Sequence, residues 1–491
     1  MEVGAMEDNK LKVVSLFSGC GGLDFGFNMS NRFKIELASD IDTSAAETYA
    51  KNFHATIVDV LPDEFHNIPM FYRTDISNLD FHALSSSFPD IDVVIGGPPC
   101  QDFSVARGSD KANAGITGKR GRLYAYFVKA LIHLKPKYFV FENVPGIISD
   151  NRGATWDIIR EDFQNLSIHV QDIEEIAGDG AEASNPGYLL AYEGVVDASA
   201  VGVPQKRRRV IIIGVRQDLV DITPFNIRGM LIERIKEACR SKVEGKALLF
   251  REYPLTPIEA FEGITMDKLE KQYNKVIDEW ISEKNNSSVP DMLKWAEEIS
   301  KSVKDGIVKN YCSANRSDYI PSLIKKSMEQ HRQILRSLGF LGSKVCSLGS
   351  TIDGTCDLPK ESENVKSRLY FTPPDKNYEF LYRYGCWRVE GKHISMIYKR
   401  IHPLKPAYTV IANGGGGTHG YHYERSRSRL TNREKARLQS FPDNFAFIGT
   451  MAEQRKIIGN AVPPLLGKAV AEAIEQIDLL IRDEAKAIEW S

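Results

Sequence analysis

The first 216 residues alternate short apolar runs with stretches in which apolar side chains recur at helical spacing. Each run is continuous rather than alternating, which predicts a strand covered on both faces. Strands that alternate with helices in this way predict a mostly parallel α/β sheet with helices on both faces. The apolar runs lie at 12–17, 33–39, 91–96, 138–142 and 210–215, and the helical stretches at 23–29 and 123–134.

Helix-capping signals and a change in residue composition mark the rest of the chain. Ser44 with Glu47, and Thr431 with Glu434, match the capping box that begins a helix. Residues 368–400 are rich in Tyr, Phe, Trp and Val and predict short strands. The sequence then ends in an apolar stripe at helical spacing, which predicts a helix that packs on the first domain. The stripe consists of Leu466, Val470, Ile474, Ile477 and Ile481.

These patterns predict three parts, and 491 residues are ample for two to three domains. We expect a sheet domain at residues 11–216 and a smaller, irregular domain at residues 217–420. Residues 421–491 are expected to form the edge of the smaller domain and the helices that return to the sheet domain.

Composition and charge narrow the class of protein. Hydrophobic residues make up 42% of the chain and charged residues 26%, which excludes a mostly disordered or fibrous protein. Because 63 Lys and Arg balance 65 Asp and Glu, any affinity for nucleic acid must come from local clusters. Such clusters occur at 107–122 and 399–437, where Lys and Arg are frequent.

Cysteine usage and the N-terminal sequence favour the cytoplasm. The 7 cysteines are scattered without a CxxC pair, so we expect neither a disulfide framework nor a metal site. The first residues have no signal-peptide pattern, and no apolar run approaches the ~18 residues of a membrane span. We therefore expect a soluble cytoplasmic protein.

A glycine-rich turn follows the first predicted strand. Its glycines let the backbone approach a ligand at the carboxyl edge of the sheet. The dinucleotide fingerprint GxGxxG fails, because its third glycine position is Asp24, but Asp40 lies about where such folds bind a ribose hydroxyl. A nucleoside-type site and a glycine turn of some other α/β enzyme both fit this pattern.

Three further positions carry candidate chemistry. Cys100 follows Gly-Gly-Pro-Pro, and prolines that fix the backbone suit a nucleophilic thiol, although a lone cysteine is more often a small buried side chain. Glu142 ends a strand, where it either caps the next helix or acts as a general acid at the same sheet edge. A basic run then enters the strand at 210–215, and side-chain alternation would direct Arg207 and Arg209 into the site.

Six blocks in this order closely resemble the C5-cytosine DNA methyltransferase family of bacterial restriction–modification systems. The unmatched middle of the chain is where that family has its variable target-recognition domain. The resemblance implies a Rossmann-like, S-adenosylmethionine-dependent methyltransferase sheet with a smaller, irregular target-recognition domain. The blocks are SLFSGCGGLDFGF (15–27), GGPPCQDFS (96–104), ENVPG (142–146), GVPQKRRRVIIIGVR (202–216), RLTNREKARLQSFPDNF (429–445) and IGNAVPP (458–464).

The family's catalytic roles carry over by position. The resemblance implies that Cys100 attacks C6 of cytosine and that Glu142 hydrogen-bonds or protonates N3. Arg209 would contact O2, with Arg207 supporting the site, and the methyl group would add at C5. Because neither carbon is reachable inside a duplex, the base must be flipped out, and the basic segment 105–122 is a candidate closing loop.

The resemblance also implies ligand-binding residues and partners. Asp40 would bind the ribose, Ile41 would lie against the adenine, and Asp75 would contact the adenine amine. The expected partners are double-stranded DNA and, as is frequent in the family, a separate restriction endonuclease; a monomer is the expected state. The residues expected to bind S-adenosylmethionine are Phe17, Gly19, Gly21, Gly22, Asp40, Ile41, Asp75, Ile76, Pro98, Leu123, Asn460 and Val462. The residues expected to contact DNA are Gln101, Ser104, Arg107, Gln205, Gly415 and Gly416.

Three other functions fit the sequence less well. An RNA cytosine methyltransferase on the same scaffold would have a shorter middle region and a Cys-Phe-Thr tripeptide, which this sequence lacks. An inactive DNA-binding regulator is disfavoured because Cys100, Glu142 and Arg209 are all present. The failed GxGxxG and a cysteine that hydride transfer does not need argue against a nicotinamide-dependent oxidoreductase.

Overall fold

The structure is a computed structural model in which the chain divides into two compact units. Unit 1 comprises Met1–Ala198, Arg208–Ala247 and Val462–Ser491, and unit 2 comprises Ser199–Arg207 and Leu248–Ala461. The residues described are 10–61, 69–99, 123–166, 187–221, 223, 225–281, 321–345, 353–383, 396–412 and 417–489.

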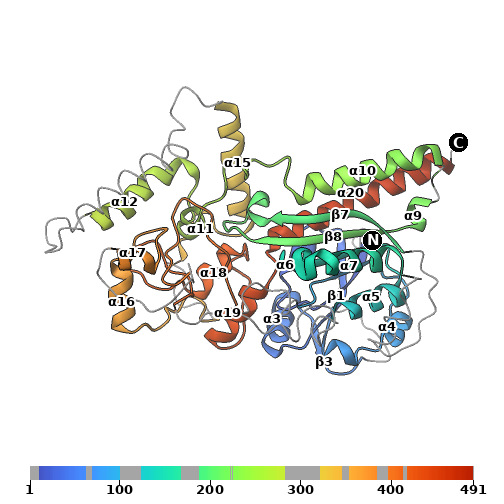
Figure 1. The fold of residues 1–491 in the computed structure, drawn as a ribbon, viewed down its shortest axis with the longest axis horizontal. Helices are drawn as coiled ribbons and strands as arrows, with labels where there is room; N and C mark the ends of the chain where they lie inside the picture. The colour runs from blue at the N-terminus through green and yellow to red at the C-terminus, as the bar shows by residue number, and fades with distance from the viewer. Residues whose placement is uncertain are drawn as a thin grey trace, which may run out of the picture. The chain divides into compact units, whose positions relative to one another are not determined.

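The described residues of unit 1 form one eight-stranded sheet in the order β3-β4-β2-β1-β5-β6-β8-β7 (Figure 1). The pairs among β1 to β6 are parallel, whereas β8 pairs antiparallel with both β6 and β7. The predicted α/β sheet is therefore confirmed. The chain turns in opposite directions on the two sides of β1, and the carboxyl ends of strands at such a reversal form the ligand-binding crevice of open α/β sheets. The strands are β1 Leu11–Leu16, β2 Phe33–Asp40, β3 Thr56–Val58, β4 Met70–Arg73, β5 Val93–Gly96, β6 Tyr138–Asn143, β7 Tyr188–Asp197 and β8 Arg208–Arg216.

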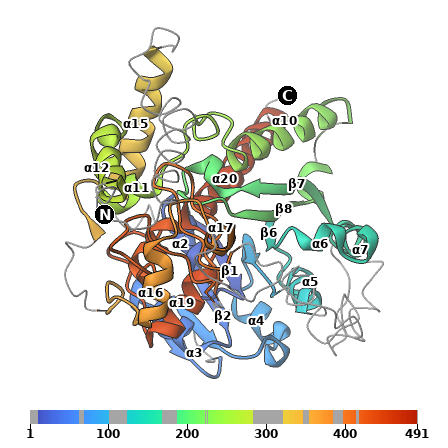
Figure 2. The same cartoon turned by 60° about the vertical axis from the view of Figure 1, so that its left-hand side comes forward.

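Helices cover both faces of this sheet (Figures 1 and 2). α4, α5 and α7 contribute to the hydrophobic core on one face, and α2, α10 and α20 pack together on the other. The helices of unit 1 are α2 Gly22–Asn28, α3 Thr43–Phe53, η1 Ile76–Asn78, α4 Phe81–Ser87, α5 Leu123–Leu134, α6 Gly146–Ser149, η3 Asp150–Gly153, α7 Ala154–Gln164, α9 Asp218–Asp221, α10 Phe225–Val243 and α20 Pro464–Glu489. The helices of unit 2 are α11 Pro257–Glu262, η5 Met266–Lys268, α12 Leu269–Ile281, α15 Pro321–Ser337, α16 Glu363–Tyr370, α17 Tyr378–Arg383, α18 Asn432–Leu438 and α19 Met451–Asn460; η4, Ala198–Val201, bridges the division.

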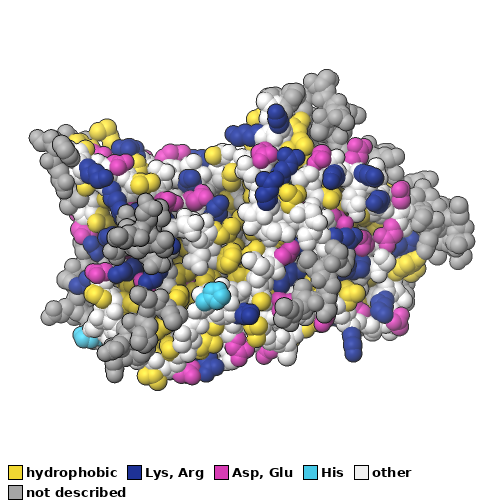
Figure 3. Space-filling view, turned by 180° about the vertical axis from the view of Figure 1, so that it is seen from behind, with side chains coloured by type: hydrophobic (Ala, Val, Ile, Leu, Met, Phe, Trp, Pro, Cys, Tyr) yellow, Lys and Arg dark blue, Asp and Glu magenta, His cyan; other side chains and the backbone are white. Residues whose placement is uncertain are grey.

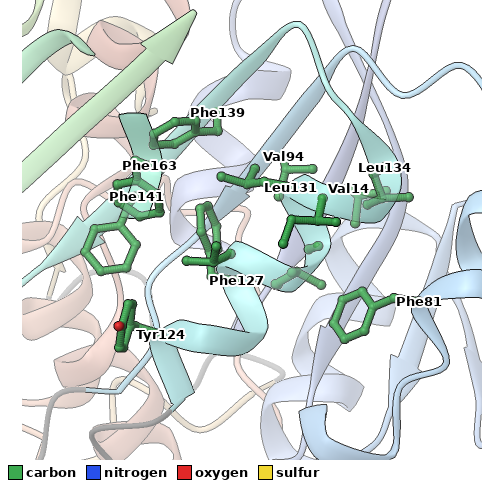
Figure 4. Packing of buried hydrophobic residues seen from close by; sticks show 14 of the residues in the cluster. Val14, Phe81, Val94, Tyr124, Phe127, Leu131, Leu134, Phe139, Phe141 and Phe163 are labelled. Atoms are coloured by element: carbon green, nitrogen blue, oxygen red, sulfur yellow. The ribbon is translucent and has the colours of Figure 1, made fainter. Parts of the chain in front are cut away.

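Aromatic side chains dominate the core beneath α5 (Figure 4). Phe127 of α5 packs edge-on against Phe141 of β6, with ring centroids 5.5 Å apart, and Phe163 of α7 lies 4.7 Å from Phe139. All four rings are fully buried. Large buried rings in edge-to-face contact stabilise a core beyond their area alone, so this layer fixes the two strands, β5 and β6, whose ends carry the candidate chemistry.

The C-terminal apolar stripe forms α20 and packs in unit 1, as the sequence predicts. Its backbone touches that of α2, because a Cβ at Gly26 would lie 2.4 Å from the Lys468 nitrogen and 2.5 Å from the Gly467 carbonyl carbon. The stretch Met451–Ala487, which contains α19 and most of α20, is long and apolar enough to cross a membrane by length and composition alone. However, 83% of its most apolar window is buried, as in a core helix.

The units depart from the expected domain limits at residues 217–247, which belong to unit 1 because α10 packs along α20. Residues 421–461 belong to unit 2 and residues 462–491 to unit 1, as expected for an edge of the smaller domain followed by a returning helix. The strands predicted at 368–400 are wrong for residues 368–383 and 396–400, which contain α17 and the end of α16; residues 384–395 lie outside the described residues. Two aromatic residues of this range, Tyr378 and Tyr398, instead pack in a small hydrophobic cluster with Tyr421.

Of the two predicted capping boxes, one is confirmed and one is wrong. The box at Thr431 and Glu434 is confirmed, with the Thr431 side chain accepting from the Glu434 nitrogen. The box at Ser44 and Glu47 is wrong, because α3 begins two residues earlier than that box requires: the side chain of Asp42 caps it by accepting from the Ala45 nitrogen.

Candidate active site

The glycine-rich turn between β1 and α2 is built from left-handed backbone and a carboxylate clamp. Phe17, Gly19 and Gly21 all have positive φ, at 55°, 54° and 84°. Asp40, at the end of the neighbouring strand β2, accepts a hydrogen bond from the Gly19 nitrogen at 2.9 Å and another from the Asp42 nitrogen at 3.0 Å. The clamp fixes the turn at the carboxyl edge of the sheet, where the sequence predicts it.

A stacked aromatic pair supports the turn from within. The rings of Tyr49 and Phe53 on α3 lie 4.0 Å apart and nearly parallel, and a Cβ at Gly21 would approach both to within 2.8 Å. The Tyr49 hydroxyl donates to Asp24 Oδ1 at 2.9 Å, and burial raises the pKa of Asp24 to about 6. Tyr49 and Phe53 are four residues apart on α3, and no sequence motif connects them to the turn.

The predicted nucleoside residues gather at the ends of β2 and β4, which are paired. Ile41 is 64% exposed, which is unusual for an isoleucine beside a buried strand end and leaves an apolar surface next to Asp40. Asp75 follows β4, is exposed, and accepts from the nitrogen and hydroxyl of Ser77, which orients its carboxylate. Ile76, the next residue, is buried.

Glu142 and Arg209 form an ion pair at the ends of β6 and β8. Arg209 Nε lies 2.8 Å from Glu142 Oε1, and both side chains are largely buried. Gly97, directly after β5, makes room for the carboxylate, since a Cβ there would lie 2.7 Å from Glu142 Oε2. The structure therefore brings together the carboxylate of one predicted block, the arginine of a second and the backbone of a third.

The segment after β5 is held by the residue beside Glu142. Asn143 Nδ2 donates to the Pro98 oxygen at 3.3 Å, and Pro98 is buried whereas Pro99 is exposed. Cys100 follows Pro99 directly in the sequence and lies outside the described residues. The predicted DNA contacts Gln101, Ser104, Arg107, Gly415 and Gly416, and the segment 105–122, also lie outside them.

Arg207 and Gln205 lie in unit 2 and are completely buried. Arg207 donates to the backbone oxygens of Val410 at 3.1 Å and Gly459 at 2.8 Å. Gln205 Nε2 donates to the Leu438 oxygen, and its Oε1 accepts from the Val410 nitrogen. Both side chains hold the backbone of unit 2 in place from its interior. Gln205, predicted to contact DNA, is buried here with its polar atoms bonded to other residues.

Three further residues predicted to bind S-adenosylmethionine lie on or beside three different helices. Leu123 begins α5 and is partly buried. Asn460 ends α19 in unit 2, and Val462 precedes α20 in unit 1. Their part in a cofactor pocket stays a prediction. Among the described residues, no group of three His, Cys, Asp or Glu side chains could hold a metal ion.

Comparisons with known proteins give the family. The sequence model described as C-5 cytosine-specific DNA methylase matches residues 11–476. The chain is 44% identical over 474 residues to the DNA (cytosine-5-)-methyltransferase M.ApeKI of Aeropyrum pernix, covering 96% of this chain and 99% of that protein. It is 28% identical to the type II methyltransferase M.NgoFVII of Neisseria gonorrhoeae, over 98% of this chain and 90% of that protein.

A solved structure with the same fold is also similar to this chain. It is a prophage-encoded E. coli protein described as a DNA modification methyltransferase, with a TM-score of 0.52 and 20% identity over 96% of this chain and 100% of that chain. The family model spans nearly the whole chain, and a relative is 44% identical over almost its full length. The chain therefore belongs to the C-5 cytosine-specific DNA methylase family and is a DNA (cytosine-5)-methyltransferase.

Proposed function

We propose that this enzyme flips a cytosine out of double-stranded DNA at a specific short sequence and methylates its C5, with S-adenosylmethionine as the methyl donor. The observation that carries the proposal is the Glu142–Arg209 ion pair, which lies against Gly97 three residues before Cys100. An acid, an arginine and a thiol at one sheet edge are the groups that addition to a cytosine ring requires.

The residues at the ends of β1, β2 and β4 fit the proposed cofactor. The exposed face of Ile41 offers an apolar platform for a purine ring, and Asp40 and Asp75 offer carboxylate acceptors for hydroxyl and amino hydrogens. The glycine turn brings backbone close to the ligand without side chains in the way. When bound, S-adenosylmethionine supplies an electrophilic methyl group at its sulfonium sulfur.

The proposed chemistry begins at C6, because C5 of cytosine is a poor nucleophile until something adds there. The Cys100 thiolate forms an S–C6 bond while Glu142 donates a hydrogen bond or proton at N3, which draws electrons out of the ring and leaves C5 as an enamine carbon. Arg209 holds Glu142 in place and contacts O2. After C5 carries the methyl group, water or hydroxide takes the C5 proton, the electron pair of that C–H bond restores the C5–C6 double bond, and the S–C6 bond breaks to release the Cys100 thiolate while N3 returns its proton to Glu142.

Target recognition is proposed for residues 217–420, with the part of that range in unit 2 as its main body. Arg207 and Gln205 support this assignment as positioning residues, because they fix the backbone around Val410, a few residues before Gly415 and Gly416. Exchanging residues 217–420 for the matching region of a relative is expected to change the methylated sequence.

We further propose that the enzyme acts as a monomer on cytoplasmic DNA and is paired with a separate restriction endonuclease of the same specificity. The type II methyltransferases among its relatives support this pairing. Gel filtration with light scattering tests the first point, and a search of the neighbouring genes for an endonuclease that its methylation blocks tests the second.

A trapping experiment tests the mechanism. In DNA copied with 5-fluorodeoxycytidine, the fluorine at C5 cannot leave as a proton does, so the S–C6 bond persists after methylation. Wild-type enzyme with S-adenosylmethionine is expected to give a protein–DNA adduct on a denaturing gel, and Cys100→Ser none. An adduct that forms equally with Cys100→Ser would contradict the assigned nucleophile, and one that forms only on RNA would contradict the proposed substrate.

A further inference from the structure

A histidine and a glutamate form a completely buried pair between two helices of unit 2. His331 of α15 and Glu259 of α11 are both 0% exposed, and Figure 1 labels the two helices. His331 Nδ1 lies 2.8 Å from Glu259 Oε1, and His331 Nε2 lies 2.8 Å from the Tyr253 carbonyl oxygen. The pair lies within unit 2 and takes no part in the reaction described above.

The partners of the imidazole fix the number of protons that the pair holds. The Tyr253 carbonyl can only accept, so His331 Nε2 carries a hydrogen. The hydrogen bond between Nδ1 and Glu259 Oε1 needs one further proton, on the imidazole or on the carboxyl group. In either form, the pair holds one proton more than a neutral imidazole beside a carboxylate, in which two lone pairs would face each other at 2.8 Å.

The surroundings keep the pair in this geometry. Glu259 Oε2 accepts from the Thr256 nitrogen at 3.0 Å and from the Thr256 hydroxyl at 2.7 Å, in the capping box that begins α11. The carboxylate therefore cannot turn away from His331 without breaking the helix cap. The buried ring of Phe250 stacks on the imidazole, with ring centroids 5.2 Å apart, and covers one face of it.

The electrostatics of His331 agree with this proton count. Burial lowers the pKa of His331, but the charge of Glu259, its hydrogen bond and the Tyr253 carbonyl outweigh burial, so the net effect raises that pKa above 6.5. These groups face the imidazole from α11 and from residues 250–253. The helix η5 also packs against α15, and the Ser327 hydroxyl contacts the Met266 sulfur there at 3.8 Å.

The two helices that the pair joins support other parts of unit 2. A Cβ at Gly202 would lie 2.3 Å from Ile334 Cδ1, so α15 packs directly against a residue three positions before Gln205. Arg437 of α18 donates to the Ala260 oxygen of α11 at 2.6 Å. A change in the contact between α11 and α15 therefore reaches both the segment that carries Gln205 and the helix α18.

We propose that His331 and Glu259 retain a shared proton in folded unit 2 at neutral and mildly alkaline pH, which makes unit 2 a pH-sensitive element of the enzyme. In the unfolded chain a histidine has a pKa of about 6.5, and folding raises the pKa of His331. The pair therefore stabilises unit 2 fully below about pH 6.5, and this stabilisation is lost as the pH rises through the folded pKa.

Exposed charges do not have this effect. Figure 3 shows Lys and Arg side chains interspersed with Asp and Glu over the described part of one face. Surface charges of this kind are well solvated in both the folded and the unfolded state, so folding changes their proton binding little. The buried pair differs because its proton has a place only while α11 and α15 are packed together.

The test compares Glu259→Gln with Glu453→Gln in the full-length enzyme. A glutamine at 259 can accept from Thr256 with its oxygen and donate to Nδ1 of a neutral imidazole with its amide, so the hydrogen bonds persist without a shared proton. Glu453 occupies the same place in the capping box of α19, where its Oε2 accepts from Thr450 at 2.7 Å, but it is exposed.

The measurement is hydrogen–deuterium exchange, read by mass spectrometry from pH 6 to pH 9. Peptides from α11 and α15 report the local opening of unit 2, and peptides from α20 are the reference in unit 1. Variants and wild type are compared at the same pH, so the intrinsic exchange rate cancels.

Above about pH 6.5, the opening equilibrium of α15 in the wild type is expected to rise by up to about tenfold per pH unit relative to Glu259→Gln. The reason is that opening releases one proton from the wild-type pair and none from the variant. Glu453→Gln is expected to follow the wild type, and α20 is expected to show no such change in any of the three proteins.

A ratio between wild type and Glu259→Gln that stays constant from pH 6 to pH 9 would overturn the proposal. So would a Glu453→Gln variant that loses the pH dependence as fully as Glu259→Gln does. The wild type alone also decides, because an opening equilibrium of α15 that is independent of pH after correction for intrinsic exchange would overturn the shared proton even if a variant failed to fold.

The consequence for recognition rests on the proposed function and has its own readout. If unit 2 reads the DNA, KM for DNA is expected to rise with pH more steeply in the wild type than in Glu259→Gln. A pH-dependent opening of α15 with equal KM profiles would overturn this consequence alone, and folded wild-type enzyme that methylates no DNA would overturn the proposed function.

Discussion

Replacing Gly97 by alanine tests the contact on which the active-site account depends most. A Cβ at Gly97 would lie 2.7 Å from Glu142 Oε2, and the next two nearest atoms, at 3.5 and 3.7 Å, also belong to Glu142. The φ of Gly97 is outside the left-handed region, so the backbone tolerates alanine. The substitution therefore acts first on Glu142, and most strongly on its carboxylate.

The expected magnitude follows from that distance. Ordinary van der Waals contact begins at about 3.4 Å, so the carboxylate must move by about 0.7 Å. This movement acts on a carboxylate whose ion pair with Arg209 is 2.8 Å long. Since a misplacement of about 1 Å can reduce a catalysed rate by about a hundredfold, we expect the methyl-transfer rate to fall about ten- to a hundredfold.

The assay is a single-turnover measurement of labelled methyl transfer to DNA, which reports the chemical step rather than product release. Gly229→Ala is the matched control, because a Cβ at that position of α10 meets nothing within 4 Å. Thermal unfolding of both variants separates catalysis from folding. A Gly97→Ala enzyme that transfers methyl groups at the rate of Gly229→Ala would refute the argument that this carboxylate must be held in place.

Three further predictions concern the packing around the glycine turn. Gly26→Ala inserts a Cβ within 2.5 Å of the backbone of α20, which cannot yield as a side chain can, so urea unfolding should show a loss of about 2–3 kcal/mol. Tyr49→Phe removes one of the two hydroxyl donors of the Asp24 carboxylate and leaves Ser15 as the other; we expect a loss of about 1–2 kcal/mol and weaker S-adenosylmethionine binding by calorimetry, and unchanged values would contradict the supporting role of this pair. Asp24→Asn tests the coupling between protonation of Asp24 and folding. Because the pKa of Asp24 rises from 3.8 to about 6 on folding, the folded state binds the carboxyl proton more tightly than the unfolded state. The free energy of unfolding of the wild type should therefore fall by up to about 3 kcal/mol relative to the variant as the pH rises from 3.8 to about 6. Denaturation curves at the two ends of the window check this, and a constant difference would contradict it.

The sequence was sufficient for the central strands because their signal is local. β1, β5, β6 and β8 are covered on both faces, so each appears as a continuous apolar run that matches its observed bounds within two residues. The sequence also predicts α20 correctly, because a long apolar stripe at helical spacing must be covered by another part of the protein. The ends of those strands also predict that Cys100, Glu142 and Arg209 belong to one edge of the sheet, whereas the role of Gly97 is visible only in the structure.

What the sequence could not predict depends on contacts between distant segments. The aromatic residues of 368–400 indicated strands, but Leu369, Tyr378 and Tyr398 form a cluster with Tyr421, and packing outweighed local propensity there. Gln205 appeared as a polar contact for DNA, yet it is buried against Leu438, more than two hundred residues later.

The same holds for the ion pairs of α18. The block RLTNREKARLQ has several cations in a short stretch, and sequence alone does not say which carboxylates pair with them. Arg433 binds Asp353, which lies eighty residues earlier in the chain, and Arg437 binds Asp443. Only the three-dimensional arrangement shows these pairings.

Bisulfite sequencing of host DNA tests the central claim most directly. The enzyme and its Cys100→Ser variant are expressed in a host without cytosine methylation, and the genomic DNA of each is treated with bisulfite and sequenced. The account predicts protected cytosines within one recurring short sequence for the wild type and none for Cys100→Ser. Protection at that sequence in both strains, or unprotected DNA from cells that contain folded wild-type enzyme, would contradict it.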